Sequence, residues 1–195
     1  GNANSSINFT GNNSHDFTGG GSFSNVNVTI ATGSTLNLDA GNAFTFRNLT
    51  IENSAILNAT SGNNNISGTL TNNGTFNNDG GTITFTGTAN TIGGTSITDF
   101  HNINVTGTLT APTTLNVAGN FNNTGTFIHN DGTVVFNGSG VQNVEGAVTF
   151  YDISTANTSS VEIEGTVALE RFLELGSGTS FDADGDSDGG EFILR

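Results

Sequence analysis

The chain of 195 residues contains no cysteine, lysine, methionine or tryptophan, and it has only three arginines and a single proline, Pro112. Without cysteine, the chain can form neither a disulfide framework nor a thiolate metal site. Three arginines against 17 acidic residues give a formal net charge of −14, so no basic surface is available to neutralise a phosphate backbone. Nucleic-acid binding is therefore excluded. No run of about 18 apolar residues occurs, so we expect no membrane insertion.

Small polar residues make up most of what is present: 31 Thr, 30 Asn, 28 Gly and 17 Ser account for over half of the chain. The apolar content of 33%, with 15 Phe at regular spacing, is too high for a disordered polar tract. We therefore expect an ordered all-β chain with a thin core. The lack of cysteine and lysine fits an extracellular or bacterial cell-surface location. The first residue is Gly1, and residues 191–195 read as a strand, so we interpret the chain as part of a longer one.

Internal repeats organise the chain. Residues 66–94 match residues 117–146 at an offset of 51, with Gly68 on Gly119 and Phe85 on Phe136. Residues 30–38 match residues 109–117 at an offset of 79. We therefore predict one elongated repeat domain over residues 1–195. Its related repeats cover about residues 7–60, 66–116 and 117–160, and residues 161–195 form acidic terminal coils that continue into the longer chain.

The apolar residues alternate with polar ones in short groups, as in Val26-x-Val28-x-Ile30 and Ile83-x-Phe85, and each group is closed by Gly, Asn-Gly or Asp-Gly. This pattern is typical of short strands, and no stretch has the spacing of a helix. We predict a right-handed parallel β-helix (β-solenoid) with Asn at coil corners, Phe and Ile stacked inside, and about 20–24 residues per coil. A β-sandwich, which uses longer strands, is the alternative.

Three segments of the sequence resemble a known kind of repeat: GTFNNDGGTITFTG, NFNNTGTFIHNDGTVVFNGSGVQNVEG and LELGSGTSFDADG. They resemble repeat regions of very large bacterial cell-surface proteins, the adhesin-like, Asn/Thr/Gly-rich β-helical exoproteins of the Bacteroidota type, which are often exported by the type IX route. The resemblance covers residues 66–195 well and residues 5–60 loosely. It implies a secreted structural or adhesive repeat.

An acidic segment near the end of the chain offers a candidate calcium site. A hard cation such as Ca²⁺ takes six to eight oxygen ligands, and a D-x-D-x-D-G loop supplies them while Gly allows the tight turn. The bidentate Glu of the complete motif is absent at its usual spacing. A solvated acidic turn explains the same residues without a metal. The candidate ligands are Asp182, Asp184, Asp186, Asp188 and Glu191.

Other candidate sites have a structural explanation. Glu162 and Glu164 alternate with Val161 and Ile163, so both carboxylates share one strand face. Such a pair serves glycoside hydrolysis in some enzymes, but the polar side of a half-buried strand gives the same pattern. We expect Arg171 to form weak surface pairs with its neighbours Glu170 and Glu174.

The three histidines also carry no strong signal. His15, His101 and His129 are isolated in sequence, and nothing predicts that they converge on a metal. We place His101 and His129 at coil corners.

The sequence therefore predicts a non-catalytic extracellular β-solenoid segment of a bacterial surface protein, acting as a stalk, adhesin or fibre element. The alternatives are a polysaccharide-active β-helix enzyme and an ice-binding module, the latter because of alternating threonines such as Thr82-x-Thr84-x-Thr86. Expected partners are adjacent domains of the parent chain, identical subunits placed end to end, or surface carbohydrate. Calcium is the one cofactor considered.

Overall fold

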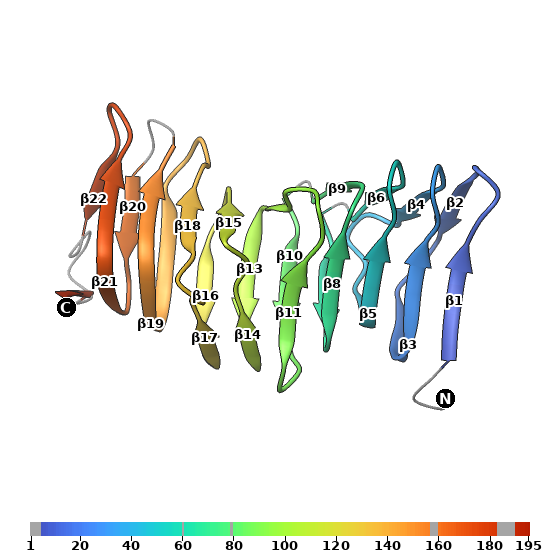
Figure 1. The fold of residues 1–195 in the computed structure, drawn as a ribbon, viewed down its shortest axis with the longest axis horizontal. Helices are drawn as coiled ribbons and strands as arrows, with labels where there is room; N and C mark the ends of the chain where they lie inside the picture. Colours follow the sequence, from blue (N-terminus) through green and yellow to red (C-terminus); the bar gives the residue numbers. More distant parts are fainter. Residues whose placement is uncertain (1–4, 60, 79, 157–159, 183–189) are drawn as a thin grey trace.

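The computed structural model describes residues 5–59, 61–78, 80–156, 160–182 and 190–195, and these wind into a β-solenoid of about nine turns (Figure 1). All strand pairings in these ranges are parallel and join a strand to its equivalent one coil further on. The solenoid prediction is confirmed, and the antiparallel sandwich alternative is excluded. The same residues contain no helix, and hence none long and apolar enough to cross a membrane.

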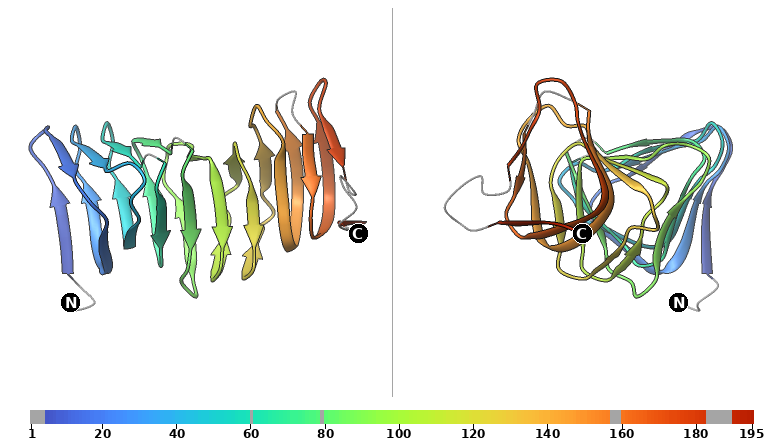
Figure 2. Two further views of the ribbon diagram at one scale, coloured as in Figure 1. Left: turned by 180° about the vertical axis from the view of Figure 1, so that it is seen from behind. Right: turned by 60° about the vertical axis from the view of Figure 1, so that its left-hand side comes forward.

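Each coil has three faces, which enclose a narrow interior (Figure 2). Face one contains the first parts of β3 (Gly21–Ile30) and β5 (Phe44–Ile51), then β7 (Asn63–Ile66), β10 (Thr82–Phe85), β13 (Asn102–Val105), β16 (Phe121–Asn123), the first part of β19 (Gln142–Thr155), β20 (Ser160–Ile163) and β22 (Ser180–Asp182). Face two contains β1 (Ser5–Phe9), the second parts of β3 and β5, β8 (Thr69–Asn72), β11 (Asn90–Gly93), β14 (Thr108–Thr110), β17 (Thr126–Ile128), the middle of β19, the first part of β21 (Thr166–Leu175) and β23 (Glu191–Leu194). Face three contains β2 (Ser14–Phe17), β4 (Thr35–Leu38), β6 (Ile56–Asn58), β9 (Thr75–Asn77), β12 (Asp99–Phe100), β15 (Thr114–Val117), β18 (Thr133–Phe136) and the last parts of β19 and β21.

The alternating pattern of the sequence decides which side chains enter the interior. In β10, Ile83 and Phe85 are buried, while Thr82 and Thr84 between them are half-buried on the outside. Phenylalanine shares the interior with Ile, Leu and Val, and several of its ring pairs meet edge to face, as Phe121 and Phe150 do at 5.4 Å. The prediction of Phe and Ile stacked inside a thin core is confirmed. The fully buried rings are those of Phe44, Phe46, Phe85, Phe100, Phe121, Phe136 and Phe150.

Amide side chains also enter the interior, which the sequence pattern did not predict. Gln142 is completely buried. Its Nε2 donates to the carbonyls of Val117 and Gly119, each at 2.8 Å, and its Oε1 accepts from the amide of Gly138 at 2.9 Å. Asn90 binds neighbouring backbone in the same way. These amides satisfy corner backbone groups that strand pairing leaves over, and buried polar groups without such partners are costly.

Asparagine ladders join successive coils on the outside of face three. Asn77 donates to Asn58 at 2.7 Å, Asn58 to Asn37 at 2.6 Å, and Asn37 to the carboxylate of Asp16 at 2.6 Å. The ladder was predicted, but at coil corners, and this one runs through the strands themselves. The reason is that outward strand positions lie directly opposite one another from coil to coil.

The corner between faces one and two requires glycine because the coils approach closely there. A Cβ on Gly107 would lie 2.0 Å from the carbonyl oxygen of Gly87, and a Cβ on Gly125 would lie 2.1 Å from that of Gly107. No side chain fits at these distances without forcing the coils apart. We call Gly87, Gly107 and Gly125 the glycine corner.

Two of the three faces are interrupted, whereas face one pairs without a break from β3 to β22. On face three, no backbone pairing joins β9 to β12 among the described residues, and on face two none joins β17 to the middle of β19. Near the first interruption the chain makes a longer excursion between β11 and β12, and Asn72 reaches across to Ile97 and Thr98. At each interruption face one and one other face stay paired, face two from β8 to β11 and face three from β18 to β19, so the coils remain in one stack.

The glycine corner makes a testable prediction. Gly107→Ala should lower the free energy of unfolding by about 1–3 kcal/mol, the usual cost of overpacking a well-packed site. Gly93→Ala is the matched control, because a Cβ there meets nothing within 4 Å. It should change stability by no more than about 0.5 kcal/mol. Equal urea midpoints for the two variants would contradict the close approach described here.

Candidate functional site

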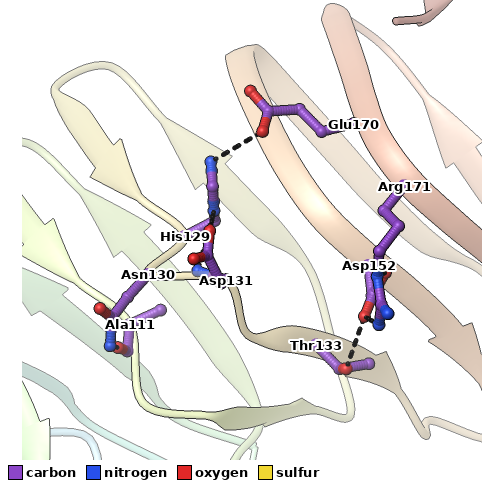
Figure 3. Close-up of polar contacts among 8 residues, drawn as sticks. All are labelled: Ala111, His129, Asn130, Asp131, Thr133, Asp152, Glu170 and Arg171. Atoms are coloured by element: carbon purple, nitrogen blue, oxygen red, sulfur yellow. Dashed lines mark hydrogen bonds and ion pairs between the residues drawn. The ribbon is translucent and has the colours of Figure 1, made fainter.

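A cluster of charged and aromatic side chains outside the core lies at one corner, between faces two and three near the C-terminal end (Figure 3). His129 follows β17, Tyr151 lies at a bulge in β19, and Glu170 and Arg171 lie in the middle of β21. These are equivalent corner positions in three successive coils. We call His129, Tyr151, Asp152, Glu170 and Arg171 the polar corner.

Three planar groups stack through the polar corner, one from each coil. The rings of His129 and Tyr151 lie 5.5 Å apart and are nearly parallel, at 15°. On the other side of Tyr151, the guanidinium carbon of Arg171 lies 4.9 Å from the ring centroid, within the range of a cation–π contact. Both faces of the only tyrosine are thus covered by protein groups, so this ring offers no open platform for stacking a ligand.

Arg171 also forms the strongest ion pair of the described residues. Its Nε donates to Oδ1 of Asp152 at 2.8 Å, and its Nη2 donates to Oδ2 of the same carboxylate. Asp152 is only 4% exposed, and Thr133 lies at 3.5 Å from Oδ2. The hydrogen bonds from Arg171 hold the pKa of Asp152 below its ordinary value, although burial alone would raise it. The same pairing raises the pKa of Arg171.

This pairing corrects one prediction. Arg171 was expected to form surface pairs with Glu170 and Glu174, its neighbours in sequence. It instead reaches back one coil to Asp152, because residues of one strand point alternately in and out while equivalent residues of adjacent coils lie side by side. Glu170 turns towards His129, with 3.5 Å between its Oε2 and Nε2 of the histidine.

His129 is oriented by its own turn. Asn130 and Asp131 both have positive φ values, of 52° and 53°, and the backbone amide of Asp131 donates to Nδ1 of His129 at 3.1 Å. With Nδ1 acting as acceptor, the ring proton of the neutral imidazole lies on Nε2, facing Glu170. The side chain of Asn130 donates to the carbonyl of Ala111 in the preceding coil at 3.3 Å. The placement of His129 and His101 at coil corners is confirmed.

Two of the predicted calcium ligands, Asp182 and Glu191, flank the last corner between faces one and two. Asp182 ends β22 and Glu191 begins β23, while Asp184, Asp186 and Asp188 lie outside the described residues. Within the described part of the chain, no three His, Asp or Glu side chains gather closely enough to hold a metal ion. Calcium binding by this segment stays a prediction.

The paired glutamates of β20 lie as predicted. Val161 and Ile163 are buried, and Glu162 and Glu164 are on the outer surface. Glu164 accepts a hydrogen bond from the Nδ2 of Asn143 in the preceding coil, at 2.5 Å. The two carboxylates therefore continue the outward polar columns of face one.

The alternating threonines follow the same rule. Thr82 and Thr84 lie opposite Asn102 and Asn104 of the next coil, so their face carries mixed columns of Thr and Asn. On face two, Thr50 and Thr71 align but are followed by Gly93. The repeated T-x-T pattern is therefore not kept from coil to coil.

Comparison with known proteins gives no further assignment, since no family model, no curated protein and no solved structure matches the chain.

The Asp152–Arg171 pair predicts a specific pH dependence. Its folded-state carboxyl pKa lies below the unfolded value of about 3.9, so its stabilising contribution is fully present above about pH 4 and is lost as the pH falls through the folded-state pKa. Asp152→Asn should therefore have a lower Tm than the wild type at pH 7, by several degrees. This Tm difference should shrink as the pH falls below about 4.

Thermal melts from pH 2 to 7 test this prediction. Glu174→Gln is the control, because Glu174 is an exposed carboxylate on the same strand, β21, and the hydrogen bonds of Asp152 are to Arg171 and Thr133. A control curve parallel to the wild type is expected. A constant Tm difference between Asp152→Asn and the wild type at every pH would show that the lost interaction is not ionic.

Proposed function

We propose that this chain is a non-catalytic, extracellular structural and adhesive segment of a bacterial surface protein, a stiff rod that serves as stalk, adhesin or fibre element. One observation carries the proposal: the backbone pairing of face one continues through the whole stack from β3 to β22. A continuous parallel ladder at about 4.8 Å per coil gives about nine coils a length of about 40 Å. The resemblance to repeat regions of large surface proteins points the same way.

The side chains outside the core support a positional role. The asparagine ladder of face three and the planar stack of the polar corner both connect one coil to the next. Arg171, the cation nearest to several carboxylates, is already paired with Asp152 and covered by Tyr151 on one face. Polysaccharide cleavage, the enzymatic alternative, has no cation and acid converging on an open cleft in this corner. Ice binding lacks the uninterrupted threonine columns it needs.

The end coils suggest the partners. Among the described residues, β1 pairs only with β3 and β2 only with β4, so each has one unpaired edge, and the same holds for β22 and β23 at the other end. Unpaired edges attract further strands unless they are capped. Adjacent domains of the parent chain, or identical subunits placed end to end, would supply the cap. The acidity of the chain keeps lateral contacts between rods weak.

Electron microscopy of the purified chain, with and without millimolar calcium, distinguishes the modes of this role. We expect isolated short rods for a stalk or adhesin segment and end-to-end filaments for a fibre subunit. Globular or irregular particles would contradict the rod.

The extracellular location and the lack of polysaccharide cleavage are tested by two further experiments. An antibody against the chain should label intact source cells as strongly as permeabilised ones, whereas labelling only after permeabilisation would contradict an extracellular role. Incubation of the chain with a panel of polysaccharides should release no reducing ends. Release that requires the folded chain would replace the structural proposal with the enzymatic one.

A further inference from the structure

The interruption of face three leaves an open groove of about 600 Å³ between β9 and β12. This volume lies within the range of about 300–1,000 Å³ that is usual for small-molecule sites. Phe76 and Ala118 supply apolar wall, and the remaining lining is mostly polar. The groove is lined by Phe76, Asn77, Asn78, Gly80, Asp99, Phe100, His101 and Ala118.

The direction of the asparagine ladder determines which atoms face this groove. Each amide of the ladder donates to the coil before it, from Asn77 to Asn58 and so on to Asp16. The last acceptor, Oδ1 of Asn77, receives no hydrogen bond from the described residues. Asp99 holds the first outward position of the column on the other side of the interruption, since it lies directly opposite Asn116 of the next coil.

Asp99 cannot complete the ladder, because a carboxylate only accepts hydrogen bonds. It begins a second short ladder by accepting from Nδ2 of Asn116 at 2.6 Å. Two acceptors, the amide oxygen of Asn77 and the carboxylate of Asp99, thus border the same groove. Two acceptors do not bond to each other, and this mismatch coincides with the place where the strands of face three part.

A third acceptor is buried beside them. Asn78 is 8% exposed, and its Nδ2 donates to the carbonyl of Gly81 at 3.3 Å. Its Oδ1 has no hydrogen-bond partner among the described residues and almost no accessible surface. A buried amide oxygen without a donor costs about 1–3 kcal/mol, but a ligand in the groove does not reach this atom, so Asn78 contributes only to the wall.

A ligand for this groove must bring several hydrogen-bond donors and no negative charge. Sugar hydroxyls meet this requirement, because each has one donor and can also accept from a group such as the ring N–H of His101. A calcium ion suits the groove less well, since the described lining residues include a single carboxylate and fall short of six to eight oxygens. A peptide strand would find only short pairing edges, the three residues of β9 and the two of β12.

We propose that the groove between β9 and β12 binds a neutral saccharide unit of a glycan, with Asn77 and Asp99 accepting its hydroxyl hydrogens. The assignment names the ligand class for the adhesive part of the proposed function and rests on that function. Such a site would attach the rod to a glycan at its side, about midway between its ends, and leave the end coils available for assembly.

Asp99→Asn is the informative variant, with Asp16→Asn as its matched control. Both substitutions replace the carboxylate that ends an asparagine ladder, but Asp16 lies at the N-terminal end, away from the groove. In Asp99→Asn the new amide can still accept from Asn116 and can also donate to Asn77. The ladder then closes across the gap, and the Tm should be unchanged or higher.

Saccharide binding is measured by amide chemical shifts in NMR titrations with cellohexaose, laminarihexaose, maltohexaose, xylohexaose and chitohexaose, and with calcium chloride alone. At least one saccharide should shift the amides of residues 76–81 and 99–101. Its affinity should fall about tenfold or more in Asp99→Asn and stay unchanged in Asp16→Asn.

Three outcomes would overturn the assignment: no saccharide shifts these amides, the Asp99→Asn variant binds as tightly as the wild type, or calcium alone shifts the same amides and competes with the sugar. We expect both variants to keep the rod shape, so electron microscopy tests the structural role independently of saccharide binding. If the chain forms rods but binds no saccharide, only the saccharide site is contradicted. If it forms globular particles, the structural role is contradicted.

Discussion

The spacing between coils, fixed at about 4.8 Å by backbone hydrogen bonds between parallel strands, is the constraint on which the other features depend. At this separation Gly107 has no room for a Cβ beneath the carbonyl of Gly87. The same separation allows flat groups to stack, and His129, Tyr151 and Arg171 follow one another at 5.5 and 4.9 Å. Glycine, planar side chains and short amides are therefore the residues that this stack selects.

The constraint also explains the low charge of the chain, in which only 10% of residues are charged. An outward residue has an equivalent one coil above and one coil below, so repeated acids would form a column of like charges about 5 Å apart. The carboxylates of the ladders instead stand at their ends, where Asp16 and Asp99 each accept from an asparagine. Where a carboxylate is buried, as at Asp152, an arginine from the next coil neutralises it.

The sequence was sufficient to predict the fold class because alternation and turn residues are local signals, and Ile83 and Phe85 point inwards as their spacing indicated. The repeat at an offset of 79 places Leu36 and Leu115 on the same face three. The repeat at an offset of 51 does not, since Phe85 lies on face one and Phe136 on face three. All three faces need the same strand and corner chemistry, so sequence similarity alone does not reveal which face a segment forms.

The polar corner and the groove were beyond the reach of sequence patterns for a related reason. Their contacts join coils that differ in length, from 17 residues between Phe100 and Val117 to 25 between Val167 and Phe192. A difference of one residue changes which side chains are opposite each other, and so the pairing of Arg171 with Asp152 depends on register. The recurrence of His101 and Tyr151 after a phenylalanine was the available hint that planar residues occupy corners.

The glycine corner has a consequence for the acidic segment. In several coils two residues ending in Gly suffice to pass from face one to face two, as Thr106-Gly107 and Thr124-Gly125 do. Between Asp182 and Glu191 the chain uses eight residues for the same step. Six of these are an insertion that the stack does not need for closure. Asp184, Asp186 and Asp188 all fall in this longer connection of the sequence.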